Sequence, residues 1–364
     1  MDIKPKTTSY LPSSRPSRIE QLQEITDVLL LSDNPKELND TVLKLYSLLS
    51  AISGINDNPI DASDSLNSVL PVGEALSPRN AARCVIDAAR TSKFLRGIYA
   101  ALLEAQQRFP NGAIEILYAG CGPFAPLAIP LTTQFKADQI QFTLLDIHAR
   151  SLESARHIAL AFGVEDYVRG YIQSDAASYA HPHPPHMVIT ETMQKALSKE
   201  PQLAITLNLA PQLCASGIFI PQRVTIDANL CDPRNEFVPG DRDSDKPLPV
   251  TQHAGGARIK LGKVFDLTAE EALELARKRG RRTCSAEAYL PAAAIDLPQE
   301  IAEGHKLMLS TIITVFGMVT IGEYESGLTH PLWFYDFSGA KARTKIEFQY
   351  FFKGNPGFKW HMSE

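Results

Sequence analysis

Apolar residues recur three and four positions apart in the first hundred residues, which is the spacing of an amphipathic helix. One helix is expected from Arg18 until the Asp-Asn-Pro sequence at 33–35 breaks it, and a second continues to about Gly54. Together they form a helical hairpin, for which packing over the main domain and dimerisation are both open roles. Residues 56–77 are polar and irregular and predict a linker, and one long helix is expected over 78–107.

From residue 114 onward, short apolar strands alternate with helices. The predicted strands are 114–120, 141–147, 167–173, 187–190 and 217–226, and the helices between the later strands are 151–162 and 202–214. This alternation predicts a parallel sheet covered by helices. Beyond residue 226 the pattern predicts an all-β region with one helix, 268–279, and strands at 264–267, 311–321 and 345–352.

The bulk composition is that of an ordinary globular protein of 364 residues, 44% hydrophobic and 21% charged. A net charge of −5 argues against a nucleic-acid partner but is compatible with a cationic substrate. The five cysteines are scattered without a CxxC pair, so neither a disulfide framework nor a zinc site is expected, and a reducing cytoplasm is the simplest location. No signal peptide is expected at the N-terminus, and the most apolar later run, 307–321, is too short and too polar to span a membrane.

A glycine turn follows the first strand of the alternating region. Gly120 and Gly122 stand where glycine lets the backbone turn sharply and approach a ligand closely. Asp146, at the tip of the next strand, is placed to accept hydrogen bonds from both hydroxyls of a ribose, which we favour over a role as a helix N-cap. Asp175, after the third strand, is placed to meet an adenine amino group. These residues predict a nucleotide-type cofactor at the carboxyl ends of the strands.

Two glutamates, Glu191 and Glu200, follow the fourth strand. Buried carboxylates repel each other and lose hydration, but two can stay ionised together when a cation lies between them. A planar guanidinium with five donors suits that arrangement best. Taken alone, the segment is more typical of an acid-rich helix start, which the helix dipole favours. The residues around it shift the balance towards a cation clamp.

Three histidines lie in the loop between the third and fourth strands, at positions 181, 183 and 186. Prolines separate them, which makes convergent ligation of a metal awkward, and no acid or cysteine is interleaved. A surface loop is therefore expected there, and no metal.

Four motifs, in order, resemble those of the protein arginine methyltransferases, a family of class I methyltransferases that use S-adenosylmethionine (SAM). DAARTSKFLRGI at 87–98 is similar to the family's DxxRTxxYxxAI helix, ETMQKALSKE at 191–200 to its double-glutamate loop, GIFIPQR at 217–223 to its GxxFPDR strand, and LTHP at 328–331 to its THW loop. The resemblance covers about residues 80 to 352.

The resemblance implies an α/β plus β fold in three parts. Residues 1–77 are the helical hairpin and linker, 78–222 a SAM-binding Rossmann-like domain, and 223–364 a β-barrel-like domain for substrate binding and dimerisation. A homodimer is expected on the same ground.

The resemblance also assigns roles to individual residues, with SAM as the cofactor. Glu191 and Glu200 are the implied catalytic residues and, with Met193, bind the substrate. His330 is a further candidate for orienting the substrate or accepting its proton, and a plain hydrogen-bonded histidine at a strand start is equally open. The implied cofactor contacts are Arg90, which holds the SAM carboxylate, Tyr118, Gly120, Gly122, Asp146, Asp175 and Ala176.

The motifs depart from the family pattern at several positions. Tyr118 stands where the family has an acid, Phe124 where it has a third glycine, and Pro331 where the THW loop has tryptophan. The paired aromatics of the family's cofactor-covering N-terminal helix are not found. These departures favour a small-molecule substrate over a protein tail, with free L-arginine or a related guanidine of a natural-product biosynthetic pathway as the first expectation.

Three functions therefore stay open. The first is N-methylation of arginine or a related guanidine. The second is a SAM enzyme of other chemistry, either C- or O-methyl transfer or cyclisation of SAM to azetidine-2-carboxylate. The third is a catalytically silent scaffold that binds partners through its N-terminal helices.

Overall fold

The computed structural model describes residues 16–56, 65–236, 258–279, 289–337 and 345–363. The helices are α1 (Arg18–Leu31), α2 (Pro35–Ser53), α3 (Pro78–Arg83), α4 (Ala88–Arg108), α5 (Ala149–Phe162), α6 (Gln202–Leu209), α7 (Pro233–Glu236) and α8 (Ala269–Arg279). The strands are β1 (Ser68–Leu70), β2 (Gly73–Ala75), β3 (Ile114–Ala119), β4 (Ile140–Asp146), β5 (Val168–Gln173), β6 (Met187–Thr190), β7 (Ile218–Ile220), β8 (Arg223–Cys231), β9 (Ile259–Leu267), β10 (Tyr289–Asp296), β11 (Lys306–Phe316), β12 (Val319–Ile321), β13 (Leu332–Phe334), β14 (Lys345–Phe351) and β15 (Gly357–Ser363).

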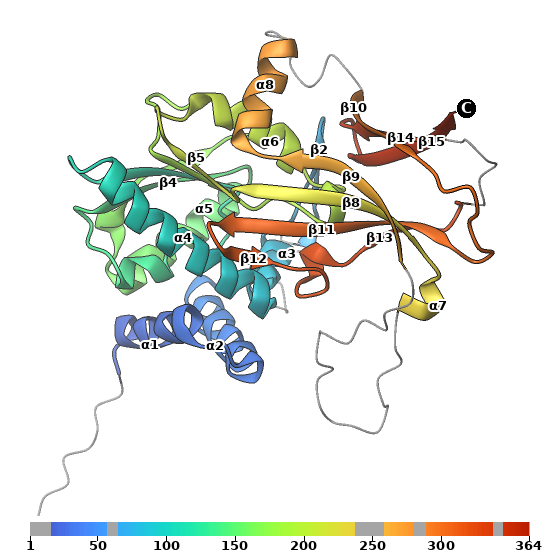
Figure 1. Cartoon of the computed structure of the whole chain (residues 1–364). Helices are drawn as coiled ribbons and strands as arrows, with labels where there is room; N and C mark the ends of the chain where they lie inside the picture. Colours follow the sequence, from blue (N-terminus) through green and yellow to red (C-terminus); the bar gives the residue numbers. More distant parts are fainter. Residues whose placement is uncertain (1–15, 57–64, 237–257, 280–288, 338–344, 364) are drawn as a thin grey trace, which may run out of the picture.

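A five-stranded parallel sheet, in the order β5-β4-β3-β6-β7, carries the first domain (Figure 1). Every residue of β6 is buried, as are most residues of β3 and β4, which is why these segments read as continuous apolar runs. The chain adds strands outward from β3 to β5 and then crosses back to place β6 on the other side of β3. The predicted parallel sheet is therefore confirmed, and its topological switch point lies between β3 and β6.

The second domain consists of antiparallel strands that extend away from the parallel sheet (Figure 1). Strand β8 lies between β9 and β11, with β12 and β13 both paired to β11, while β10, β14 and β15 form a separate three-stranded sheet. The sequence predicted a barrel-like domain. In the residues that the structure describes, the strands form these two open sheets and do not close into one barrel.

Two predicted elements are interrupted by local backbone chemistry. The single helix expected over 78–107 divides at Asp87, whose extended backbone ends the first part and whose side chain accepts a 3.0 Å hydrogen bond from the Arg90 backbone to begin α4. The strand expected over 217–226 divides at Pro221, because proline has no N–H to donate to a sheet. The first part becomes β7 of the parallel sheet and the second becomes β8 of the antiparallel sheet.

Several other strands were not predicted from the sequence. The predicted linker at 56–77 contains the β1–β2 hairpin. The strand expected over 311–321 turns back at Gly317, which adopts a φ of +56° and separates β11 from β12. Strands β10, β13 and β15 were not predicted. Each is either short or lacks a clean alternation of apolar and polar residues, so its sequence pattern is weak.

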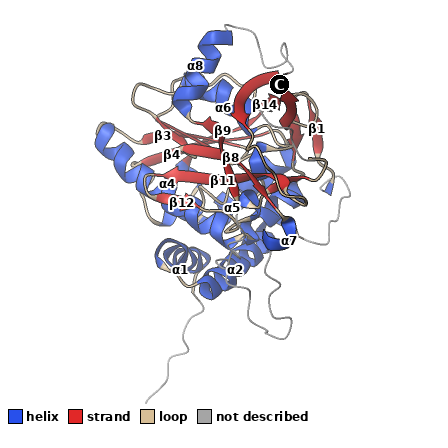
Figure 2. Ribbon diagram, turned by 45° about the vertical axis from the view of Figure 1, so that its right-hand side comes forward, coloured by secondary structure: helices blue, strands red, loops and turns tan. Residues whose placement is uncertain are grey.

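The N-terminal hairpin is confirmed and packs on the first domain, beneath the rest of the molecule in both views (Figure 1, Figure 2). Helix α1 begins with a capping box of Ser17 and Glu20, and α2 ends at Gly54, which has a φ of +74°. Helix α1 contacts α4, and α2 contacts α4 and α5. The fully buried side chains of the two helices include Leu22, Leu29, Leu45 and Leu49. Of the two roles left open for the hairpin, packing over the main domain is the one observed.

Candidate functional site

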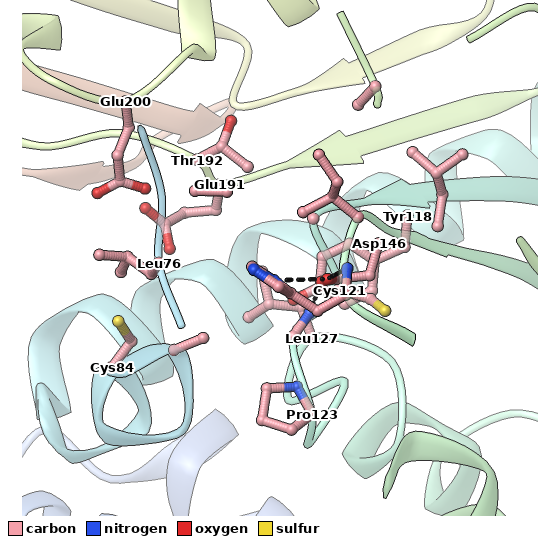
Figure 3. Close-up of a pocket in the computed structure, with 18 of the residues that line it drawn as sticks. Leu76, Cys84, Tyr118, Cys121, Pro123, Leu127, Asp146, Glu191, Thr192 and Glu200 are labelled. Carbon is pink, nitrogen blue, oxygen red and sulfur yellow. Dashed lines mark hydrogen bonds and ion pairs between the residues drawn. The ribbon is translucent and has the colours of Figure 1, made fainter. Parts of the chain in front are cut away.

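A pocket opens at the carboxyl ends of the parallel strands, at the switch point between β3 and β6 (Figure 3). Together with its open mouth, it contains about 980 Å³ of space that no protein atom fills. It is lined by the β1–β2 hairpin, α3 and the turn that follows it, the start of α4, the glycine turn after β3, the tips of β4 and β5, the loop that begins after β6, and the start of α6.

The glycine turn is shaped as the sequence predicts. Gly120 and Gly122 adopt φ values of +72° and +62°, which residues with a Cβ rarely adopt. A Cβ at Gly120 would also collide with the side chain of Thr192, which follows β6. Glycine at 120 therefore lets the β3 and β6 strand ends approach each other and keeps the pocket open between them.

Asp146 lies at the tip of β4 and is buried, with its carboxylate facing the glycine turn. Its Oδ2 accepts a 2.9 Å hydrogen bond from the Gly122 backbone, and its Oδ1 accepts one of 2.9 Å from the His148 backbone. A carboxylate has about four acceptor sites, so each oxygen keeps capacity for a ligand hydroxyl. Asp175 and Ala176, at the tip of β5, line the same end of the pocket.

The two departures near the glycine turn have different consequences. Tyr118 lines the pocket and is buried, and this burial raises the pKa of its hydroxyl well above the ordinary value, so the side chain stays neutral. Phe124 is fully buried, and its ring meets that of Tyr46 on α2 edge-on at 5.9 Å. The third glycine of the family pattern is thus replaced by a contact that fixes the N-terminal hairpin beside the glycine turn.

Arg90 and Glu191 meet inside the pocket. Arg90, from the first turn of α4, donates from its guanidinium to Glu191 Oε2. The Glu191 side chain is only 7% exposed, and its other oxygen, Oε1, is buried without a hydrogen-bond partner among the described residues. Buried acceptors without a partner are uncommon in folded proteins, and a ligand donor is one way to satisfy them.

Glu200 reaches the same pocket from the far end of the loop. It is 6% exposed, and burial raises its pKa from 4.5 to about 7, even though nearby Arg90 and a hydrogen bond from Gln194 lower it. The negative charge of Glu74 contributes to the increase. In Figure 3 the Glu191 and Glu200 side chains lie toward one end of the pocket, and Tyr118 and Asp146 toward the other.

The loop between the two glutamates has an unusual backbone. Three of its non-glycine residues have positive φ angles of 51°, 52° and 64°: Ala196, Leu197 and Lys199. Each such residue costs about 1–2 kcal/mol, so the surrounding structure must hold the loop in this shape.

The second domain supplies that support. The Ala196 backbone donates to Thr311 Oγ1 of β11 at 3.0 Å, and the hydroxyl of Tyr350 on β14 donates to the Leu197 carbonyl at 2.7 Å. The Lys199 backbone donates to the carbonyl of Pro356 at 2.8 Å. The antiparallel sheets therefore position the glutamates over a pocket whose other end belongs to the first domain.

Two of the predicted site residues lie outside the pocket lining. Met193 is buried in the core, and His330 is exposed, with its ring 6.0 Å from that of Tyr324. The residues just before His330 dock on the start of α4, because Asp87 Oδ2 accepts hydrogen bonds from Ser326 Oγ at 2.7 Å and from the Gly327 backbone at 2.9 Å. In this structure the residues just before the LTHP motif thus join the two domains, and none of the four motif residues lines the pocket.

The most important lining residue that the sequence analysis missed is Glu74, in the β1–β2 hairpin. Its backbone N–H donates to the Lys199 carbonyl at 2.9 Å, which ties the hairpin to the glutamate loop. A Pro-Val-Gly turn at 71–73 was the available signal, because proline and glycine between short strand-like runs predict a hairpin. Cys84, His148 and Thr192 also line the pocket.

In the described residues, no three His, Cys, Asp or Glu side chains converge as a group that could hold a metal ion. Across the same parts of the chain, no helix has both the length and the apolar character needed to cross a membrane.

Comparison with known proteins gives a distant likeness in shape alone. No family model matches the chain, and no curated protein matches its sequence. Among solved structures, it is similar to the Trypanosoma brucei PRMT1 enzyme-prozyme heterotetrameric complex with AdoHcy, at 12% identity and a TM-score of 0.48, over 78% of this chain and 97% of that one. It is also similar to Arabidopsis thaliana protein arginine methyltransferase 10, at 9% identity and a TM-score of 0.48, over 77% and 96% of the two chains. At such identities and TM-scores, an inference about function has to rest on the pocket itself.

Proposed function

We propose that this protein is a SAM-dependent N-methyltransferase that acts on the guanidinium of a small molecule. The observation that carries the proposal is the pair of glutamates, Glu191 and Glu200. Both are more than nine-tenths buried, both line one pocket with the glycine turn, and Glu191 presents an oxygen without a partner.

The cofactor end of the pocket suits SAM. The positive-φ turn at Gly120 and Gly122 allows close approach of a ligand to the backbone, and Asp146 has acceptor capacity for ribose hydroxyls. Arg90 is the guanidinium within reach of a ligand carboxylate. When bound, SAM supplies a methyl group whose carbon a nitrogen nucleophile can attack, with the sulfonium sulfur as the leaving group.

The acceptor end suits a planar cation. A guanidinium can donate one N–H to Glu191 Oε1 and others to Glu200, and the two carboxylates fix the plane and direction of its nitrogens. Negative charge beside the acceptor offsets the positive charge that develops on its reacting nitrogen. Glu200, with a pKa raised by burial to about 7, is suited to accept the proton that this nitrogen releases.

A methyl-transfer assay tests the proposal. The full chain is incubated with SAM and L-arginine, and methylated arginine is sought by mass spectrometry. Methylated product is expected from the wild type and from Glu104→Gln, a surface control on α4, but not from Glu191→Gln. Full activity in Glu191→Gln would exclude the glutamate clamp, and a failure of S-adenosylhomocysteine to bind in calorimetry would exclude SAM as cofactor.

One observation favours a second candidate, a SAM-consuming reaction without a separate acceptor. Glu191 already has a guanidinium partner in Arg90, which satisfies one of its oxygens without any substrate. In a cyclisation, the amino nitrogen of SAM would displace methylthioadenosine from its own chain and give up a proton to a carboxylate. Release of methylthioadenosine without any added acceptor would establish this reaction in place of methyl transfer.

A further inference from the structure

The charged groups that line the pocket are strongly unbalanced. Among the described lining residues there is one guanidinium, Arg90, no lysine and a single histidine, His148. The carboxylates number five: Glu74, Asp146, Asp175, Glu191 and Glu200. Arg90 is already paired with Glu191 and is also the group that the proposed function assigns to the SAM carboxylate, so it does not balance the remaining carboxylates, whose negative charge a cationic ligand would neutralise.

Glu74 belongs to the acceptor end of this pocket. Its backbone bonds to Lys199, the residue before Glu200, and its charge helps to raise the pKa of Glu200. The preceding Gly73 lies so close to the loop that a Cβ there would be 2.9 Å from the Lys199 carbonyl oxygen. Asn67 donates from its side chain to Glu74 Oε1 and so helps to orient the carboxylate.

Three carboxylates therefore gather where the proposed function needs only two. An acidic cluster alone would be compatible with a solvated surface. Here the Glu191 side chain lines the pocket and is only 7% exposed, and its Oε1 is buried without a partner in the described chain. A buried acceptor of this kind points to a ligand that donates hydrogen bonds.

We infer that the acceptor is a dication without a carboxylate: its guanidinium binds at Glu191 and Glu200, and a second, amine cation binds at Glu74. The inference rests on the proposed function and narrows its substrate class. A substrate carboxylate, such as that of L-arginine, would face three acidic side chains with no unpaired lysine or arginine among the described lining residues. Such like-charge contacts are a common means of rejecting a wrong ligand. Glu74 is thus a specificity-determining residue.

The test compares two acceptors that differ by one carboxylate, agmatine (4-aminobutylguanidine) and L-arginine, with the full chain and SAM. We expect kcat/KM to be at least about tenfold higher for agmatine. Glu74→Gln keeps an oxygen for Asn67 but removes the charge, so it should raise KM for agmatine about tenfold. Because it also relieves the repulsion of the substrate carboxylate, it should not lower kcat/KM for L-arginine, and the agmatine-to-arginine ratio of kcat/KM should fall about tenfold or more. Glu104→Gln is the matched surface control.

The outcomes separate this inference from the function on which it rests. Methylation of L-arginine in preference to agmatine, or an agmatine-to-arginine ratio that Glu74→Gln leaves unchanged, overturns the dication inference and leaves methyl transfer intact. Calorimetry with S-adenosylhomocysteine present measures agmatine binding by itself and so tests the dication inference apart from methyl transfer. Binding of agmatine that depends on Glu74, without methylation of either acceptor, overturns methyl transfer and supports recognition of a dication. If agmatine neither binds nor is methylated, both the dication inference and methyl transfer are overturned.

Discussion

The two ends of the pocket are built in different ways. At the cofactor end, the polar groups come from the strand tips of one sheet, and both oxygens of Asp146 already have backbone partners. At the acceptor end, the glutamates come from a loop that a second domain holds in shape. There, Glu191 keeps an oxygen without a partner, and burial raises the pKa of Glu200 to about 7.

This difference indicates that the acceptor end is less stable than the cofactor end when no ligand is bound. A carboxylate that accepts two backbone hydrogen bonds is stable without a ligand, so the cofactor end is ready before anything binds. Two buried carboxylates that share one cation, Arg90, beside a backbone with three positive φ angles are unfavourable until a second cation binds. We therefore expect substitutions at the acceptor end to affect turnover most and to increase the stability of the unliganded protein in some cases.

The largest expected effect is the loss of turnover in Glu200→Gln. Removing the charge should lower kcat by about 100-fold or more, because the carboxylate both holds the guanidinium and accepts a proton. Affinity for S-adenosylhomocysteine, measured by calorimetry, should be unchanged, because Asp146 and the glycine turn are untouched. Retention of full activity would show that Glu200 neither holds the acceptor nor accepts its proton.

The second expected effect concerns the stability of the unliganded protein and its dependence on pH. The Glu200 carboxyl titrates near 4.5 when the chain is unfolded and near 7 when it is folded. Between these values the folded protein keeps a proton that the unfolded chain releases, so this residue lowers the free energy of unfolding as pH rises from about 4.5 to 7. The upper limit of that loss is about 3 kcal/mol.

Denaturant unfolding of wild type and Glu200→Gln at pH 5 and pH 8 measures this effect. Glu200→Gln does not titrate, so it should gain stability relative to wild type at pH 8 and much less at pH 5. Equal differences between the two proteins at both pH values would mean that Glu200 is not held in the environment described here.

A smaller effect is expected at the cofactor end. Asp146→Ala removes the acceptor for the Gly122 and His148 backbones and for the proposed ribose, and should weaken binding of S-adenosylhomocysteine about tenfold, or ~1.4 kcal/mol. Asp138→Ala, an exposed position just before the opposite end of the same strand, is the matched control. If both variants bind equally well, Asp146 shapes the turn without contacting the cofactor.

The cofactor end could be predicted closely from the sequence. Strand β3, the glycine turn and Asp146 lie on two consecutive parallel strands and the segment that joins them, where apolar strands, glycine and a terminal acid each report local structure. The structure brings Tyr118, Asp175 and Ala176 to the same pocket, as expected. These residues are fixed by the strand that carries them, so their placement follows once the strands are recognised.

The acceptor end could be predicted only in part. Glu191 and Glu200 were identified by their spacing, but the contacts that hold their loop come from β11 and β14, more than a hundred residues later, and no local pattern encodes such pairing. Glu74 was missed because its hairpin has strands of only three residues. His330 was a candidate for the substrate site, with a plain hydrogen-bonded histidine equally open, and in the structure it is exposed outside the pocket lining. Ser326, just before its motif, donates to Asp87, a contact that depends on how the two domains meet.

The smallest expected effect would show whether the second domain holds the glutamate loop. Tyr350→Phe deletes the hydroxyl that donates to the Leu197 carbonyl and leaves the ring in the core, so the free energy of unfolding should fall by about 1 kcal/mol. Because that carbonyl belongs to one of the positive-φ residues, the loop should also relax, and kcat/KM for the acceptor should fall several-fold. Affinity for S-adenosylhomocysteine should not change. Tyr289→Phe, an exposed tyrosine in the same three-stranded sheet, is the matched control. A loss of stability with kcat/KM unchanged would mean that the loop keeps its shape without this bond, and that the strain between the glutamates is supported from the first domain instead.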